Sequence, residues 1–210
     1  MRAFTTSSLD AHARHRWAGA LGALCVLALA GAGCSETVRT GQSSAYMILE
    51  RLEAAAGGAG SAATFTGILR SDVATEGSVF EDNGRVALRL ALKDVTNPTG
   101  PTTNNLITIN RYRVDFRRTD GRNTPGVDVP YGFDGAIGVT VTPEGQDAVF
   151  TLVRAQAKLE APLVTLRGGG GALVISSVAD VTFFGKDQTG RDVTVTGSIS
   201  VNFADWADPE

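Results

Sequence analysis

The 210-residue chain is 43% hydrophobic and carries 22 acidic against 19 basic side chains, a formal net charge of −3. This slight acidic excess disfavours generic binding to nucleic acid, which needs a basic surface. The only histidines and cysteines are His12, His15, Cys25 and Cys34, all within the first 34 residues. The fate of that segment therefore decides which chemistries remain open to the folded part.

The first 33 residues have the order of an export signal. Arg2, Arg14 and Arg16 precede an apolar run over residues 17–33 that is rich in glycine and alanine. The run falls just short of the roughly 20 residues that span a bilayer comfortably, and it ends in small residues that suit cleavage. We therefore interpret residues 1–33 as a signal peptide and not as a permanent transmembrane helix.

Cys34 follows these small residues directly, in the sequence Ala32-Gly33-Cys34. The motif resembles the lipobox of bacterial lipoproteins, whose cysteine is acylated and becomes the first residue of the mature chain. Gly31 stands where that family usually has leucine, and A-x-A sequences just upstream also suit ordinary signal peptidase. An unpaired thiol in an oxidising compartment would invite crosslinking, which favours lipidation at Cys34. The resemblance implies a palmitate-bearing membrane anchor on the cell envelope, and Ser35 implies the outer membrane.

Cleavage at Cys34 would change the chemistry of the chain. Both histidines and Cys25 leave with the signal, and 16 basic side chains remain against 21 acidic ones. Ser-His-Asp and Cys-His nucleophiles are then excluded, as are metal sites built on imidazole or thiolate. We expect no cofactor and assign no metal, and whether calcium binds the acidic loops is left open.

The residues after Cys34 change from polar to periodic. Residues 34–43 are polar without hydrophobic periodicity and are interpreted as a lipidated tether. Over residues 44–57, Leu49 and Leu52 recur at helical spacing and Gly57 is a stop signal. The sequence therefore predicts one short helix over residues 44–57.

From residue 63 the pattern alternates between apolar and polar residues, which is typical of half-buried strands. We predict strands over residues 64–70, 85–95, 107–118, 136–142, 148–158, 162–167, 172–184 and 192–203. About eight short strands separated by turn sequences indicate an all-β antiparallel sandwich over residues 63–210.

Residues 107–118 contain a change of face. Ile107 and Ile109 share one parity, whereas Tyr112 and Phe116 share the other. Because one extra residue in a strand restores the alternation, we predict a β-bulge near Asn110.

Two segments carry a resemblance to known sandwiches. Residues 181–201 look like the last hairpin of bacterial immunoglobulin-like domains, and residues 111–121 resemble a middle strand of fibronectin type III modules. These resemblances imply an immunoglobulin-like β-sandwich.

Carboxylates are the remaining route to catalysis, because paired Asp and Glu can cleave glycosides without histidine. They cluster in turn sequences, such as Asp82 in EDNG and Asp187 in DQTG, where aspartate makes Asx turns and solvates loops. We therefore expect a protein that is not an enzyme. The alternative is a carbohydrate-active accessory domain or a histidine-free carboxylate hydrolase of the envelope.

An arginine-rich strand and the loop after it form the candidate contact surface. Forked guanidinium donors on one face could bind an envelope protein or an anionic glycan, or they could pair with acids on neighbouring strands. The aromatic residues of the loop could anchor a partner or cap the core. The candidate partner-binding residues are Arg111, Arg113, Arg117, Arg118, Tyr131 and Phe133. The expected function is that of a lipid-anchored envelope module for binding, adhesion or scaffolding.

Overall fold

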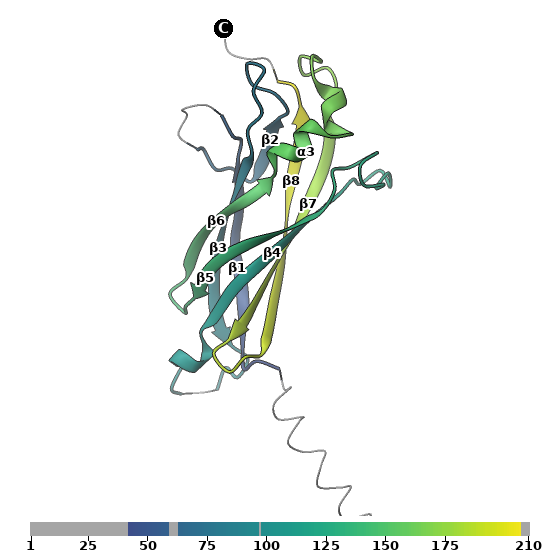
Figure 1. The fold of residues 1–210 in the computed structure, drawn as a ribbon. Helices are drawn as coiled ribbons and strands as arrows, with labels where there is room; N and C mark the ends of the chain where they lie inside the picture. Colours follow the sequence, from purple (N-terminus) through teal and green to yellow (C-terminus); the bar gives the residue numbers. More distant parts are fainter. Residues whose placement is uncertain (1–41, 59–62, 97, 207–210) are drawn as a thin grey trace, which may run out of the picture. The chain divides into compact units, whose positions relative to one another are not determined.

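The computed structural model describes residues 42–58, 63–96 and 98–206. The predicted signal peptide, Cys34 and most of the tether lie outside the described residues. Within the described part, eight strands form two facing sheets, with very little helix (Figure 1). The prediction of an all-β sandwich is confirmed.

The smaller sheet has three antiparallel strands in the order β1-β3-β6, so that β3 lies between the other two. These strands are β1 (Ala45–Ala55), β3 (Asp82–Leu92) and β6 (Gln146–Val153). Alternate residues of β3, among them Val86, Leu88 and Leu90, are buried against the facing sheet.

The larger sheet has the order β2-β8-β7-β4-β5, in which only the edge pair β2 and β8 is parallel. Its strands are β2 (Ile68–Asp72), β4 (Ile107–Arg117), β5 (Phe133–Val141), β7 (Ile175–Asp187) and β8 (Asp192–Ala204). Three short helical turns complete the described elements: η1 (Thr103–Asn105), α3 (Ala155–Leu159) and η2 (Leu163–Leu166).

The helix predicted over residues 44–57 is wrong, because this segment is strand β1. The register of β1 against β3 shifts between Leu49 and Arg51, which marks a bulge. Ala45 and Leu49 contact the core before the bulge and Leu52 after it. The spacing of these residues, four positions and then three, matches one face of a helix. This is why the sequence pattern predicted a helix.

The strand predicted over residues 162–167 is also wrong, because η2 occupies this segment. Pro162 has no N–H to donate to the hydrogen bonds between strands. Leu163 and Leu166 are three residues apart and are both buried, because they lie on the same side of a 3-10 turn. The strand predicted over residues 148–158 ends at Val153, after which α3 begins.

The two most detailed strand predictions are confirmed. The register of β4 shifts between Ile109 and Arg111 against both neighbouring strands, which places the bulge at Asn110. Residues on both sides of it, Ile107 and Tyr112 among them, are consequently buried. β7 and β8 form the predicted hairpin and are paired almost along their whole length.

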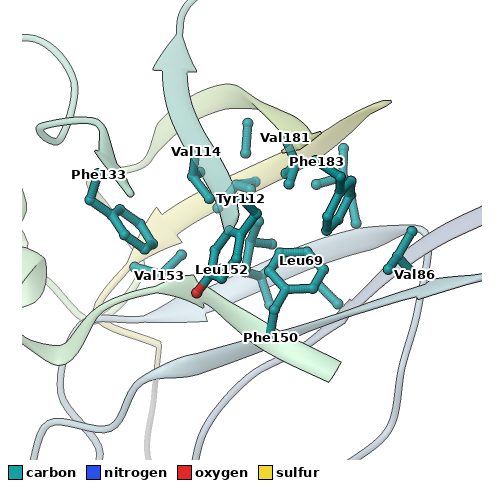
Figure 2. Packing of buried hydrophobic residues seen from close by; sticks show 14 of the residues in the cluster. Leu69, Val86, Tyr112, Val114, Phe133, Phe150, Leu152, Val153, Val181 and Phe183 are labelled. Atoms are coloured by element: carbon teal, nitrogen blue, oxygen red, sulfur yellow. The ribbon is translucent and has the colours of Figure 1, made fainter. Parts of the chain in front are cut away.

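A cluster of aromatic rings joins the two sheets (Figure 2). The ring centroid of Tyr112 in β4 lies 5.0 Å from that of Phe150 in β6, and Phe150 lies 5.3 Å from Phe183 in β7. The Tyr112 hydroxyl donates a hydrogen bond to the backbone carbonyl of Thr151 at 3.0 Å. Gly135 lies opposite Tyr112 in β5, where a Cβ atom would overlap the tyrosine ring.

We expect Gly135→Ala to lower the free energy of unfolding by about 1–3 kcal/mol, because the new methyl group must displace the Tyr112 ring from a packed core. Gly138→Ala is the matched control in the same strand, since a Cβ there meets no atom within 4 Å. Chemical denaturation of both variants measures the difference. Equal losses in the two variants would contradict this account of the core.

Candidate functional site: the arginine face and the loop end

The arginine face is the outer surface of β4, formed by Arg111, Arg113 and Arg117. These side chains alternate with buried residues and point away from the core, with roughly half of each exposed to solvent. The bulge at Asn110 lets this face stay polar while the other face of β4 remains apolar along its length.

Each of these arginines has a carboxylate partner. Arg113 donates two hydrogen bonds of 2.8 Å to Asp115 and one of 2.9 Å to Asp134 in β5. Asp134 also accepts a hydrogen bond of 2.7 Å from Arg111, whose guanidinium lies 3.9 Å from the ring centroid of Phe184. Hydrogen bonds from the arginine to Asp115 are the main cause that raises the pKa of Arg113.

The same pairing continues toward the end of β4. Arg117 pairs with Asp180 in β7, which also accepts a hydrogen bond from Ser198 in β8. Burial acts to raise the pKa of Asp180, but the hydrogen bonds from Arg117 and Ser198 outweigh it and the pKa is lowered.

Arg118 and Arg122 share the carboxylate of Asp120, and their hydrogen bonds hold its pKa well below the usual range. With these pairs, the arginine face presents alternating charges rather than a cationic patch. Exposed pairs of this kind contribute little to stability.

The two aromatic candidates lie in different environments. Tyr131 is 53% exposed, and its ring lies against Gly126, where a side chain would overlap it. Phe133 begins β5 and is only 7% exposed, with its ring edge-on to Tyr112 at 6.2 Å. Of the two interpretations of these aromatic residues, Phe133 fits the one in which the ring caps the core, and of the two only Tyr131 lies at the surface.

Two irregular segments lie at one end of the sandwich, which we call the loop end (Figure 1). It comprises the loop of residues 118–132 and the segment of residues 154–174 that carries α3 and η2. Both lie toward the end opposite Ala45, where β1 begins (Figure 1). Most of the exposed large hydrophobic residues of the described chain belong to it: Val127, Tyr131, Leu159, Val164, Leu173 and Val174.

A buried carboxylate lies beneath the loop end. Asp82, the first residue of β3, is fully buried, and the Nζ atom of Lys158 in α3 lies 2.8 Å from its Oδ1 atom. The Ser71 hydroxyl donates to Oδ2 at 2.6 Å, and the Gly57 N–H donates to Oδ1 at 2.9 Å. We call this contact the Asp82 junction.

The Asp82 junction corrects one interpretation of the sequence. Asp82 was expected to solvate a turn, but EDNG opens a strand and its carboxyl is buried. Burial is the main cause that raises the pKa of Asp82, against the opposing effect of Lys158. Asp187 does make the expected Asx turn, since it accepts hydrogen bonds from the backbone N–H groups of Thr189 and Arg191.

Sequence reasoning missed the apolar loop end and the role of Lys158. The strand predicted over residues 148–158 ended at Lys158, and its alternating pattern gave no sign that this lysine has a buried partner. The sequence signal that was available is the position of Lys158 between the apolar residues Ala157 and Leu159. A lysine that is buried in such a segment needs a partner for its charge.

An open groove of about 420 Å³ lies along the smaller sheet and is lined by carboxylates, among them Glu50, Glu144 and Asp147. Glu50 is paired with Arg89 at 2.7 Å, and Asp147 is paired with Arg51 at 3.7 Å. Among the described residues, no three Asp, Glu, His or Cys side chains are grouped so that they could hold a metal ion. The part of the chain that the structure describes also contains no helix of the length and apolarity that crossing a bilayer requires.

Comparison with protein-family models, with curated protein sequences and with solved structures finds no significant match to this chain. The geometry of its own surface and interior is therefore the basis for assigning a function.

Proposed function

We propose that this chain is a lipid-anchored, non-enzymatic, immunoglobulin-like β-sandwich of the cell envelope that serves as a binding, adhesion or scaffolding module. The lipobox-like sequence at Cys34 supports the anchor, in the outer membrane of a cell that has two membranes. A tether of about ten residues reaches at most about 35 Å. It would hold the sandwich close to the membrane through the end where β1 begins.

The single observation that carries the proposal is the concentration of exposed apolar side chains at the loop end. Apolar groups exposed together on a folded domain mark a surface that another molecule covers. The arginine face is a weaker candidate, because its guanidinium groups are already paired with carboxylates. The proposed partner is therefore an envelope protein that contacts Tyr131 and the α3–η2 segment, with Arg118 nearby, rather than an anionic glycan.

The anchor is tested by metabolic labelling with palmitate. We expect Cys34→Ala to abolish the label, because the thiol is the site of acylation. Cys25→Ala is the matched control, since this cysteine lies within the apolar run of the signal and should leave the label unchanged. Labelling that survives Cys34→Ala would contradict the proposed anchor.

The contact surface is tested by placing a photo-crosslinking residue at Leu173 in the intact cell. We expect discrete protein adducts, because Leu173 is 57% exposed at the loop end. The matched control is Val149 in β6, which is equally exposed on the side of the smaller sheet. Adducts of the same size and yield from both positions, or none from Leu173, would reject the loop end as the contact surface.

A further inference from the structure

The Asp82 junction places a primary amine against a carboxyl group in a water-excluded interior. Lys158 is 1% exposed and is among the largest fully buried side chains of the described residues, and Asp82 is 0% exposed. Their contact of 2.8 Å joins residues 76 positions apart in the sequence. An isolated buried ion pair is costly to desolvate, and burial raises the pKa of the Asp82 carboxyl.

The two oxygen atoms of the Asp82 carboxyl accept hydrogen bonds from different kinds of donor. Oδ1 accepts the N–H of Gly57 at 2.9 Å, and Oδ2 accepts the hydroxyl of Ser71 at 2.6 Å. The backbone at Gly57 comes so close to Glu81 that a Cβ atom would overlap the carbonyl oxygen of that residue, which holds the Gly57 N–H in place. One oxygen thus has a fixed backbone donor, and the other has a hydroxyl that can pass protons.

We propose that Lys158 and Asp82 condense to form an intramolecular amide bond that links α3 covalently to β3. A proton passes from the Nζ atom of Lys158 to the carboxylate across their 2.8 Å contact, and Nζ then attacks Cγ of the protonated carboxyl group to form a C–N bond. The negative charge that develops on Oδ1 is stabilised by the Gly57 N–H. The bond between Cγ and Oδ2 then breaks.

Oδ2 leaves as water and carries the carboxyl proton and one proton from the amine, while the Ser71 hydroxyl, 2.6 Å away, donates a hydrogen bond to the leaving oxygen. The product is a neutral amide with Oδ1 as its carbonyl oxygen, and no oxidant or reductant is needed. The close approach of the two groups replaces an encounter in solution. A neutral amide also removes the two buried charges, so the product suits its surroundings better than the ion pair.

This inference goes beyond the proposed function and does not depend on it. The chain has two cysteines, both within the first 34 residues, so the sandwich has no disulfide of its own. A covalent link between Lys158 and Asp82 would hold α3 on β3.

The test is a tryptic digest of the full-length protein, denatured before digestion and analysed by mass spectrometry. We expect a branched peptide in which residues 155–167 are joined to residues 71–85, with the summed mass less one water, because trypsin cannot cleave after an acylated Lys158. The internal control is the exposed pair Lys186 and Asp192, in contact at 2.6 Å, which should stay unlinked.

Quantitative recovery of the free peptide of residues 155–158, together with linear residues 71–85, would overturn the proposal without the need for any variant. Lys158→Arg keeps a cation and should abolish the branched peptide, and its persistence would equally overturn the assignment. Ser71→Ala should lower the linked fraction, and an unchanged fraction would overturn the role of the Ser71 hydroxyl.

Discussion

The carboxyl group of Asp82 is buried, so its hydrogen-bond partners have to come from inside the protein. Its partners come from three other segments: Gly57 after β1, Ser71 in β2 and Lys158 in α3. Loss of Lys158 would leave the buried carboxyl without its charge partner, and loss of the Ser71 hydroxyl would remove the hydrogen bond to Oδ2. Either loss costs more than loss of a surface pair. The Asp82 junction therefore ties α3 to the start of β3.

A strand could be predicted from the sequence where its apolar and polar residues alternate over many consecutive positions. β8 alternates over almost all of its length and was predicted nearly to the residue, and the parity change in β4 was long enough on both sides to reveal the bulge at Asn110. β1 has only a few apolar residues on each side of its own bulge, so the pattern imitated a helix. η2 was mistaken for a strand because a short apolar run does not reveal its period.

The candidate site was harder to predict, because its contacts cross between elements. The sequence showed that the arginines share a face of β4, but not that Asp134 and Asp180 would lie beside them, since this requires the order of strands in the sheet. Phe133 lies only two residues after the exposed Tyr131, and only the position of β5 against Tyr112 places its ring in the core. The partner of Lys158 is 76 positions away, beyond the range of any local pattern.

The described sandwich carries paired charges on its arginine face, exposed apolar side chains at its loop end and one buried junction between Asp82 and Lys158. The most direct test of that junction is the free energy of unfolding of Lys158→Met compared with Lys186→Met, whose lysine is also paired with an aspartate but is exposed. The account predicts a loss of about 3–5 kcal/mol for Lys158→Met and little change for Lys186→Met. Equally small losses in both variants would contradict it.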